Sequence, residues 1–291
     1  MPSNSIARSR FFRAVRIQND GRMKLLLPKT RAARVASALG VLALVCAVDG
    51  FFVEPNWIEV THHSLSAPVA QPLKIAHLTD LHTKNVGFRE RRLLKLLDQE
   101  KPDLIVITGD TISSTGTYEQ ESHLLRQLHA PLGVWLVRGN WENWHTLRNE
   151  SEFYRANGVH FLLNRSAEIQ PNVWLTGFDD TSFASVDLDR SFSNVPANSY
   201  RIALFHAPAF FSQSARRYDL ALAGHSHGGQ VRVPFWGPLW LPAGVGPYVH
   251  GWFSSGAARM YVSRGVGTTI LPVRFACRPE LAVITLQPMA N

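Results

Sequence analysis

Seven side chains of this chain are of types that hold divalent metal ions, and each follows a short apolar stretch. The stretches are LKIAHLTDLH, DLIVITGD, GVWLVRGN, RIALFHAP and DLALAGHSHGGQ. Their polar residues are Asp80, His82, Asp110, Asn140, His206, His225 and His227. Unpaired polar groups inside a protein core cost several kcal/mol each. A bound pair of metal ions would remove that cost, so the joint pattern predicts a metal centre, although no single stretch is specific.

The ligand types point to nitrogen and hard oxygen rather than sulfur. The only two cysteines are Cys46 and Cys277, and the first lies in an apolar run, which excludes a thiolate zinc site and a disulfide framework. Asp80 and His82 are two residues apart, so they would reach one ion from the same side if the preceding strand continued through them. His225 and His227 have the same spacing. Neighbouring glycines permit tight turns and let a substrate approach the backbone: Gly109, Gly139, Gly224, Gly228 and Gly229.

Strands and helices alternate in the region that must position these residues. Apolar runs predict strands over residues 73–79, 103–108, 134–138, 173–177, 201–205, 219–223, 260–263 and 281–286. Helices are expected over residues 88–100, 118–129 and 146–156. Ligands of open α/β sheets gather beyond the carboxyl ends of the strands, where the loops converge. The sequence therefore predicts an α/β sandwich of two packed sheets flanked by helices, with the polar residues at one edge.

The order of these polar motifs along the chain resembles that of a known family. The series Asp-Leu-His, Gly-Asp, Gly-Asn, a separate His and Gly-His-Ser-His-Gly-Gly-Gln is similar to that of the calcineurin-like metallophosphoesterases. The tail YVSRGVGTTILPVRFACRPELAVITL and the apolar N-terminal segment resemble the small bacterial branch that includes the YkuE and YaeI phosphodiesterases. The resemblance covers roughly residues 54–288 and implies a four-layer α-β-β-α sandwich for residues 54–291.

The resemblance also implies roles for the polar residues. Asp80, His82 and His227 would hold one divalent ion, Asn140, His206 and His225 the other, and Asp110 would bridge them. Such a pair, of Mn, Fe or Zn, activates water to hydrolyse a phosphodiester or pyrophosphate bond. The residues expected to carry catalysis are Asp110, Asn140 and His227, and those expected to contact substrate are Trp141 and Gly228.

The third motif departs from the family. The family usually has Gly-Asn-His followed by an acid, and its His assists the leaving group, whereas this chain has Gly139-Asn140-Trp141-Glu142. An indole donates no useful proton at neutral pH, which removes a contribution of roughly 10²–10⁴-fold. Either His145 or His77 replaces the acid, or the leaving group needs no protonation. A third alternative is a non-catalytic, metal-binding membrane scaffold, although every inferred ligand is present.

A leaving group that needs no proton favours a pyrophosphate that expels a phosphate. The UDP-2,3-diacylglucosamine hydrolases of lipid A biosynthesis, in the same superfamily, fit that description. An aromatic segment at residues 234–253 contains Trp236, Trp240 and Trp252 and follows the last metal motif. It is interpreted either as a loop that packs its own aromatic rings or as a membrane-facing lid for acyl chains.

The N-terminus indicates a membrane. The net charge of +8 lies entirely in residues 1–34, a basic arm, so the remaining chain is neutral and lacks the positive surface of a nucleic-acid-binding protein. Met23 would be a natural start for a shorter basic segment. Residues 35–53 form an apolar run preceded by basic side chains, which is typical of a signal-anchor, with a cleaved signal, a buried helix and an interfacial helix as alternatives.

We expect a bacterial inner membrane protein with one N-terminal anchor. The expected partners are the lipid bilayer and a phosphorylated lipid or nucleotide-lipid, with no nucleic acid and no inferable protein partner. The basic arm would place the catalytic domain outside the cytoplasm, where nucleotide-linked sugars are not expected. If the apolar run spans the membrane, an extracytoplasmic phospholipid or a general phosphodiester substrate is favoured instead.

Overall fold

The computed structural model describes residues 30–113, 116–183 and 186–289. Most of the basic arm and the alternative start at Met23 lie outside these residues. The chain divides into two compact units, the second of which comprises residues 46–291. The first described helix, α1 (Arg31–Val48), has no buried residue. Among the described residues, the helical stretch Arg31–Asn56 alone is long and apolar enough to cross a membrane by length and composition.

The first sheet of the second unit has six strands in the order β1-β14-β2-β3-β4-β5. β2, β3, β4 and β5 are parallel neighbours, and β14 pairs antiparallel with β2 and parallel with β1. In chain order the strands are β1 (Glu59–Ala67), β2 (Leu73–Leu78), β3 (Leu104–Thr108), β4 (Val134–Val137), β5 (Val159–Phe161) and β14 (Glu280–Pro288).

The second sheet also has six strands, in the order β12-β13-β9-β8-β7-β6. Its parallel centre is formed by β7, β8, β9 and β13, and β6 and β12 are antiparallel edges. The strands are β6 (Arg165–Gln170), β7 (Val173–Gly177), β8 (Tyr200–Leu204), β9 (Leu220–Ala223), β12 (Gly251–Ser255) and β13 (Ala258–Val262). A separate hairpin joins β10 (Arg232–Val233) to β11 (Gly237–Pro238).

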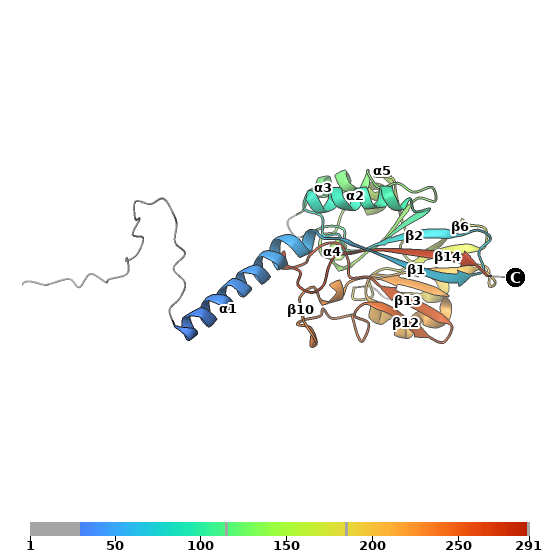
Figure 1. Cartoon of the computed structure of the whole chain (residues 1–291). Helices are drawn as coiled ribbons and strands as arrows, with labels where there is room; N and C mark the ends of the chain where they lie inside the picture. The colour runs from blue at the N-terminus through green and yellow to red at the C-terminus, as the bar shows by residue number, and fades with distance from the viewer. Residues whose placement is uncertain (1–29, 114–115, 184–185, 290–291) are drawn as a thin grey trace, which may run out of the picture. The chain divides into compact units, whose positions relative to one another are not determined.

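Helices cover both outer faces, and Figure 1 shows α2, α3 and α5 together on one side of the first sheet. The helices of this side are α2 (Phe88–Glu100), α3 (Tyr118–Leu125) and α5 (Glu150–Ala156), and the short α4 (Asn140–Trp144) follows β4. Those of the second sheet are α6 (Leu188–Ser191) and α7 (Phe211–Ser214), with short turns η3 (Pro208–Phe210) and η4 (Ala215–Arg217). Further turns are η1 (Asp49–Val53), η2 (Glu54–Asn56) and η5 (His227–Gly229).

Helix α2 shows how the sequence sets these elements. The Glu90 carboxylate accepts the N–H of Gly87 and so caps the start of the helix, and Lys101 ends it in a left-handed conformation. Leu93, Leu96 and Leu97 lie on one face and are buried.

Three apolar cores separate four layers. One core lies between the two sheets and contains Ile75, Val106, Leu175 and Ile202. A second packs the helices of the first sheet against it, and a third packs those of the second sheet. The structure is therefore a helix-sheet-sheet-helix sandwich, which confirms the predicted fold class.

All eight expected strands are present, with ends that differ by at most two residues, and α2 has the expected bounds. The other two helices are shorter than expected: α3 ends at Leu125 and α5 begins at Glu150. The four edge strands of the two sheets, β1, β5, β6 and β12, were not expected from the sequence, and neither was the hairpin of β10 and β11. The aromatic segment 234–253 is not one unit. Trp252 belongs to β12 and packs on Tyr261, whereas Trp236 and Trp240 are exposed.

Candidate metal centre and active site

The seven predicted ligands meet at the edge where the parallel strands of both sheets end. Asp80 and His82 follow β2, Asp110 follows β3, and Asn140 opens α4 after β4. In the other sheet His206 follows β8, and His225 and His227 follow β9. All seven side chains are buried. The rule that loops beyond parallel strands converge is confirmed for both sheets.

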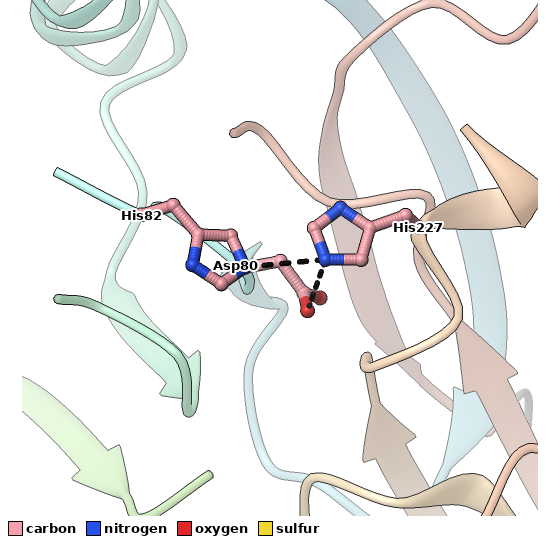
Figure 2. A group of neighbouring side chains, drawn as sticks. All are labelled: Asp80, His82 and His227. Carbon is pink, nitrogen blue, oxygen red and sulfur yellow. Dashed lines mark hydrogen bonds and ion pairs between the residues drawn. The ribbon is translucent and has the colours of Figure 1, made fainter. Parts of the chain in front are cut away.

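Asp80, His82 and His227 form the first group (Figure 2). The Nε2 atom of His227 lies 3.2 Å from Asp80 Oδ1 and 3.2 Å from His82 Nε2. Asp80 Oδ1 is buried and has no hydrogen-bond partner among the described residues. The other oxygen, Oδ2, accepts the Thr79 hydroxyl and the N–H of His225. One carboxylate oxygen is thus held in place while the other is free for an ion.

Asp110, His206 and His225 form the second group. His206 Nε2 lies 3.0 Å from His225 Nδ1, 3.1 Å from Asn140 Oδ1 and 3.2 Å from Asp110 Oδ2. The sequence-based assignment of Asn140 to this group therefore agrees with its position.

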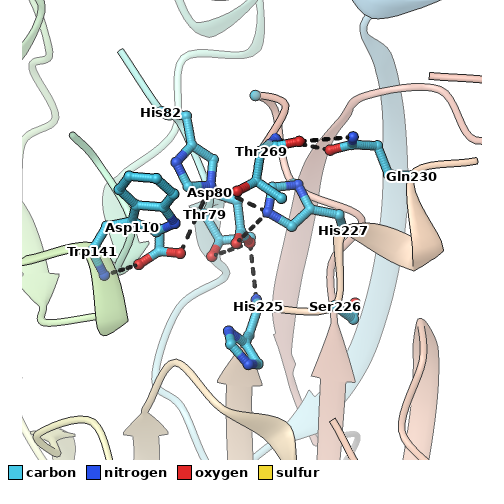
Figure 3. Close-up of polar contacts among 12 residues, drawn as sticks. Thr79, Asp80, His82, Asp110, Trp141, His225, Ser226, His227, Gln230 and Thr269 are labelled. Carbon is cyan, nitrogen blue, oxygen red and sulfur yellow. Dashed lines mark hydrogen bonds and ion pairs between the residues drawn. The ribbon is translucent and has the colours of Figure 1, made fainter. Parts of the chain in front are cut away.

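Asp110 lies between the two groups. Its Oδ2 atom is 3.7 Å from His82 Nε2 as well as 3.2 Å from His206 Nε2. Its Oδ1 atom accepts the backbone N–H of Trp141 at 2.9 Å (Figure 3). The free oxygen thus faces a ligand from each group, which is the position that a bridging carboxylate requires.

The hydrogen bonds of the histidine rings fit a cation better than they fit a polar core. His206 Nδ1 donates to Thr108 O at 2.7 Å, and His225 Nε2 donates to Ala243 O at 2.7 Å. When both rings are neutral, the nitrogens that face each other at 3.0 Å both carry lone pairs, so a proton or a metal ion is needed between them. His82 is oriented in the same way, because its Nδ1 donates a hydrogen bond to Ile112 O at 3.3 Å. Ligand histidines are usually fixed by such bonds from the other ring nitrogen, so these residues fit two divalent ions.

Burial sets the charge of the ligands. Burial and the neighbouring imidazoles lower the pKa of His225 to about 4 and that of His82 well below its ordinary value, so both rings are neutral at pH 7. Burial raises the pKa of Asp110, against the opposing effect of His206. Burial lowers the pKa of His206, but Asp110, together with Asp80 and Asp180, outweighs burial and raises the pKa of that ring to about 10. Divalent ions would take the place of the proton that this pair shares.

The ligand side chains are aimed by unusual backbone conformations, not by the pleat of a strand. Strand β2 ends at Leu78, so the expectation that a continuing strand orients Asp80 and His82 is wrong. Positive φ angles occur instead at five ligands: Asp80 (51°), His82 (43°), Asp110 (55°), His225 (68°) and His227 (49°). Such angles are uncommon outside glycine and concentrate at functional sites.

Gly224 and Gly228 are glycines for different steric reasons. A Cβ on Gly224 would lie 1.9 Å from Thr79 Oγ1 and 2.6 Å from Asp80 Oδ2. Gly228 has a φ of +61°, and a Cβ there would meet Arg264 and Cys277. The structure therefore gives Gly228 a packing constraint, and it is not among the described residues that line the cavity at the metal groups.

A cavity of about 330 Å³ opens onto the metal groups. Ligands form its floor, and aromatic and apolar side chains form its walls. Its lining residues are Asp110, Asn140, Trp141, Trp144, Ser182, Phe183, His225, His227, Trp240, Pro242, Ala243, Thr269 and Ile270. Trp141 thus lies at the predicted substrate position, where its ring meets the ring of His82 edge-on at 5.3 Å.

Neither suggested replacement for the missing acid reaches this cavity. His145 stacks on Trp141 with centroids 5.4 Å apart, and its Nδ1 contacts Trp141 O. His77 is fully buried and bonded to the Thr108 hydroxyl, and burial lowers its pKa to about 4. Among the described lining residues, the only titratable side chains are Asp110, His225 and His227, all of them ligands.

Three positioning residues were missed by the sequence reasoning. Glu142 ties the second motif to the third, Arg274 gathers backbone carbonyls behind His227, and Gln230 holds the loop at Thr269. Glu142 and Gln230 lie inside the quoted motifs, which was the available signal. Two acidic residues follow β7: Asp179 pairs with Arg138 at 3.1 Å, and Asp180 is buried with one oxygen that has no partner among the described residues.

The comparisons with known proteins agree with this geometry. The family model described as calcineurin-like phosphoesterase matches residues 73–229, more than half of the chain. The chain is a calcineurin-like metallophosphoesterase. It is 31% identical to the uncharacterized metallophosphoesterase YkuE of Bacillus subtilis, covering 81% of this chain and 88% of that protein. It is also 31% identical to the phosphodiesterase YaeI of Escherichia coli, covering 84% and 95%.

This calcineurin-like metallophosphoesterase is accordingly a phosphoester hydrolase that uses two divalent metal ions. A more distant relative, the transmembrane protein with metallophosphoesterase domain of Danio rerio, is 26% identical, covering 91% of this chain and 68% of that protein.

Proposed function

We propose that this metallophosphoesterase hydrolyses a pyrophosphate or phosphodiester bond in a lipid-linked substrate of the UDP-2,3-diacylglucosamine type, as in lipid A biosynthesis. One observation carries the proposal: a single cavity joins the buried ligand groups to walls formed by Trp141, Trp144, Phe183 and Trp240. A phosphate needs the ligands, and an acyl or other apolar tail needs the walls.

The protein's own residues hold and orient the reacting groups. Asp80, His82 and His227 hold one ion, and Asn140, His206 and His225 hold the other, with Asp110 shared. Two divalent ions, when bound, acidify water and stabilise the charge that develops on the phosphoryl oxygens. The aromatic walls exclude bulk water and so strengthen these electrostatic contacts.

The absence of a general acid in the described cavity lining favours a particular leaving group. A phosphate expelled from a pyrophosphate departs without being protonated, whereas an alkoxide does not depart easily. Trp141 therefore supports a pyrophosphate substrate over an alkyl phosphodiester.

Membrane attachment fits a lipid substrate. The apolar helix α1 precedes the catalytic unit and would serve as a signal-anchor in a bacterial inner membrane. The transmembrane name of the zebrafish relative supports an anchor in this chain.

The basic residues before α1 favour a second candidate, an extracytoplasmic phospholipid phosphodiesterase. Arg31 and Arg34 stand at the start of the apolar helix, and basic residues tend to stay on the cytoplasmic side. The catalytic unit would then face phospholipid head groups. A topology reporter fused after the last residue separates the two candidates, because an extracytoplasmic reading would overturn the nucleotide-linked substrate.

The decisive experiment uses the full chain in detergent micelles, stripped of metal and then supplied with Mn²⁺. A chromogenic phosphodiester, a chromogenic phosphomonoester and a UDP-diacylglucosamine are offered to the wild type, to Asp110→Ala and to the exposed control Asp98→Asn. We expect Mn²⁺-dependent turnover, fastest with the diphospho-lipid, that falls more than about 100-fold in Asp110→Ala and is unchanged in the control. Hydrolysis of the chromogenic ester but not of the diphospho-lipid would overturn the substrate proposal.

A further inference from the structure

Six large apolar side chains beside the cavity are exposed, although such residues usually lie in a core. They are Phe235, Trp236, Leu239, Trp240, Ile270 and Leu271, here called the apolar rim. Trp236 is 86% exposed and Ile270 77% exposed. Isolated apolar side chains on a surface are common, but a cluster around a functional opening marks a binding surface.

Hydrogen bonds hold the backbone of the apolar rim in a defined conformation. Its two segments, residues 235–240 and 270–271, both follow the last metal motif in the chain, and hydrogen bonds of Gln230 and Val231 hold them beside it. The Gln230 amide donates to Thr269 O at 3.0 Å and to Leu271 O at 3.2 Å, and it accepts the N–H of Thr269 at 2.9 Å (Figure 3). Leu239 N–H donates to Val231 O on the other side. These bonds hold apolar side chains in water next to the ligands.

Two rim residues adopt costly backbone conformations. Ile270 has a φ of 60° and Phe235 a φ of 67°. A positive φ is a genuine outlier for a β-branched residue such as Ile270 and costs on the order of 1–3 kcal/mol. The hairpin of β10 and β11 places Phe235 and Trp236 at its tip. A strained backbone that leaves apolar side chains exposed is unfavourable by itself, so we expect a binding partner that covers these side chains.

The loop that carries Ile270 and Leu271 lies next to the segment that follows the apolar helix α1. The loop that carries Ile270 and Leu271 continues to Arg274, whose N–H donates to Gly50 O at 2.9 Å. Gly50 lies only two residues after the end of α1, and the next residues, Phe51 and Phe52, are exposed. Because the chain is continuous, a bilayer that receives the apolar residues up to Val48 begins within a few residues of this contact.

The local charge suits an anionic membrane surface. Residues 220–279 contain no Asp or Glu but five arginines. Two of them, Arg264 and Arg274, are partly or fully buried, and Arg232 lies at the hairpin that carries Trp236. Anionic head groups near the rim would therefore meet no carboxylate from this stretch of the chain.

A groove of about 160 Å³ connects the rim to the active site. It is lined by Leu239, Trp240, Ile270 and Leu271, among others, and it shares Trp240 and Ile270 with the catalytic cavity. An acyl chain that enters at the rim would have an apolar path to the ligands.

We propose that the apolar rim inserts into the head-group region of the same bilayer that anchors the chain, so that lipid reaches the metal centre without leaving the membrane. The inference deepens the proposed function and rests on it for the nature of the substrate. The insertion itself requires no turnover.

Site-specific fluorescence of the full chain in vesicles tests the insertion. Cys46→Ser leaves buried Cys277 as the remaining cysteine, so Leu239→Cys or Ile270→Cys can be labelled with an environment-sensitive dye. Glu152→Cys on α5, whose side chain is 66% exposed, is the matched control. The proteins are reconstituted in vesicles of phosphatidylethanolamine and phosphatidylglycerol with or without lipids that carry a quencher near the head group.

We expect a blue-shifted emission and at least about two-fold stronger quenching at positions 239 and 270 than at position 152. Equal quenching at all three positions would overturn the insertion. A blue shift that is insensitive to quencher lipids but grows with protein concentration would also overturn it, in favour of a second copy of the chain. Repeating the measurement with Asp110→Ala separates the two proposals, because quenching that persists without hydrolysis supports insertion alone.

Discussion

The carboxylate of Glu142 accepts the backbone N–H of Asp110 at 2.9 Å and so fixes the residue that faces both metal groups. The same carboxylate accepts the N–H groups of Thr111 and Gly139, both at 2.7 Å, and the Thr111 hydroxyl at 2.8 Å. Glu142 is 1% exposed. One buried carboxylate therefore joins the loops that carry Asp110 and Asn140, and the position of both ligands depends on it.

Replacing Glu142 by Gln is expected to weaken metal binding. The amide nitrogen of Gln would face N–H donors that now find an oxygen, so at least one buried donor would lose its acceptor. We expect a 10–100-fold loss of Mn²⁺ affinity, roughly the effect of removing a residue that supports a ligand, and a loss of about 1–3 kcal/mol in unfolding free energy. Calorimetric titration and denaturant unfolding measure the two. Glu152→Gln, on the exposed face of α5, is the control, and equal Mn²⁺ affinity in both variants would contradict the role.

Arg274 is fully buried, and its guanidinium donates to backbone carbonyls of the loops around His227. The acceptors include Gly267 O at 2.7 Å, Arg264 O at 2.9 Å and Cys277 O at 3.0 Å. Lys has one compact donor group in place of the planar fork, so Arg274→Lys leaves several carbonyls without a donor. We expect thermal unfolding to report a loss of at least about 2 kcal/mol. The control is Arg155→Lys, at a side chain that is 80% exposed; similar melting temperatures for the two variants would argue against this role.

The buried carboxylate of Glu280, which pairs with Arg264, makes the unfolding free energy depend on pH. Burial alone would raise its pKa, but Arg264 and hydrogen bonds from Thr61 and Tyr261 outweigh burial and lower the pKa to about 2. A carboxyl with a depressed folded-state pKa stabilises the protein above its unfolded value of about 4.5, and this stabilisation is lost as the pH falls towards 2. The difference corresponds to on the order of 3 kcal/mol.

Unfolding of wild type and Glu280→Gln in urea at several pH values between 7 and 3 tests this linkage. We expect the stability difference between the two proteins to shrink as the pH falls below about 4.5. Both samples contain a chelator, so that loss of metal from the ligand groups does not contribute to the slope. A difference that stays constant with pH would refute the depressed pKa.

The metal ligands could be predicted from the sequence because each follows an apolar run. Parallel strands end at a common edge, so placing Asp110 or His206 at a strand end was enough to bring them together. The orientation of Asp80 and His82 was not predictable in this way, because it depends on positive φ angles after the strand has ended. The backbone at these two residues is bonded to the loop after β3, because Asp80 N–H donates to Gly109 O and His82 N–H donates to Asp110 O, both at 3.0 Å.

Of the strands that were missed, β1 owes its structure to a distant partner, whereas β6 and β12 pair with the next strand along the chain. Strand β1 has the sequence EVTHHSLSA, which has little apolar alternation, and it becomes a strand by pairing with β14 more than 200 residues away. The Glu142 contacts also connect residues about 30 positions apart. Local pattern carries no information about such pairings.

Trp141→His is expected to restore general-acid catalysis. Trp141 lines the cavity, its backbone N–H donates to Asp110, and its ring lies beside His82, so an imidazole at this position would face the leaving group without changing the backbone contact. We expect hydrolysis of alkyl phosphodiesters to rise by up to about 10²–10⁴-fold, while a p-nitrophenyl ester, whose leaving group needs no proton, changes little. Trp144→His, at the next aromatic residue of α4 in the same cavity, controls for lost wall area. A gain of the same size for both esters would indicate relief of crowding instead of proton donation, and the choice of a pyrophosphate over an alkyl diester would then lose its chemical basis.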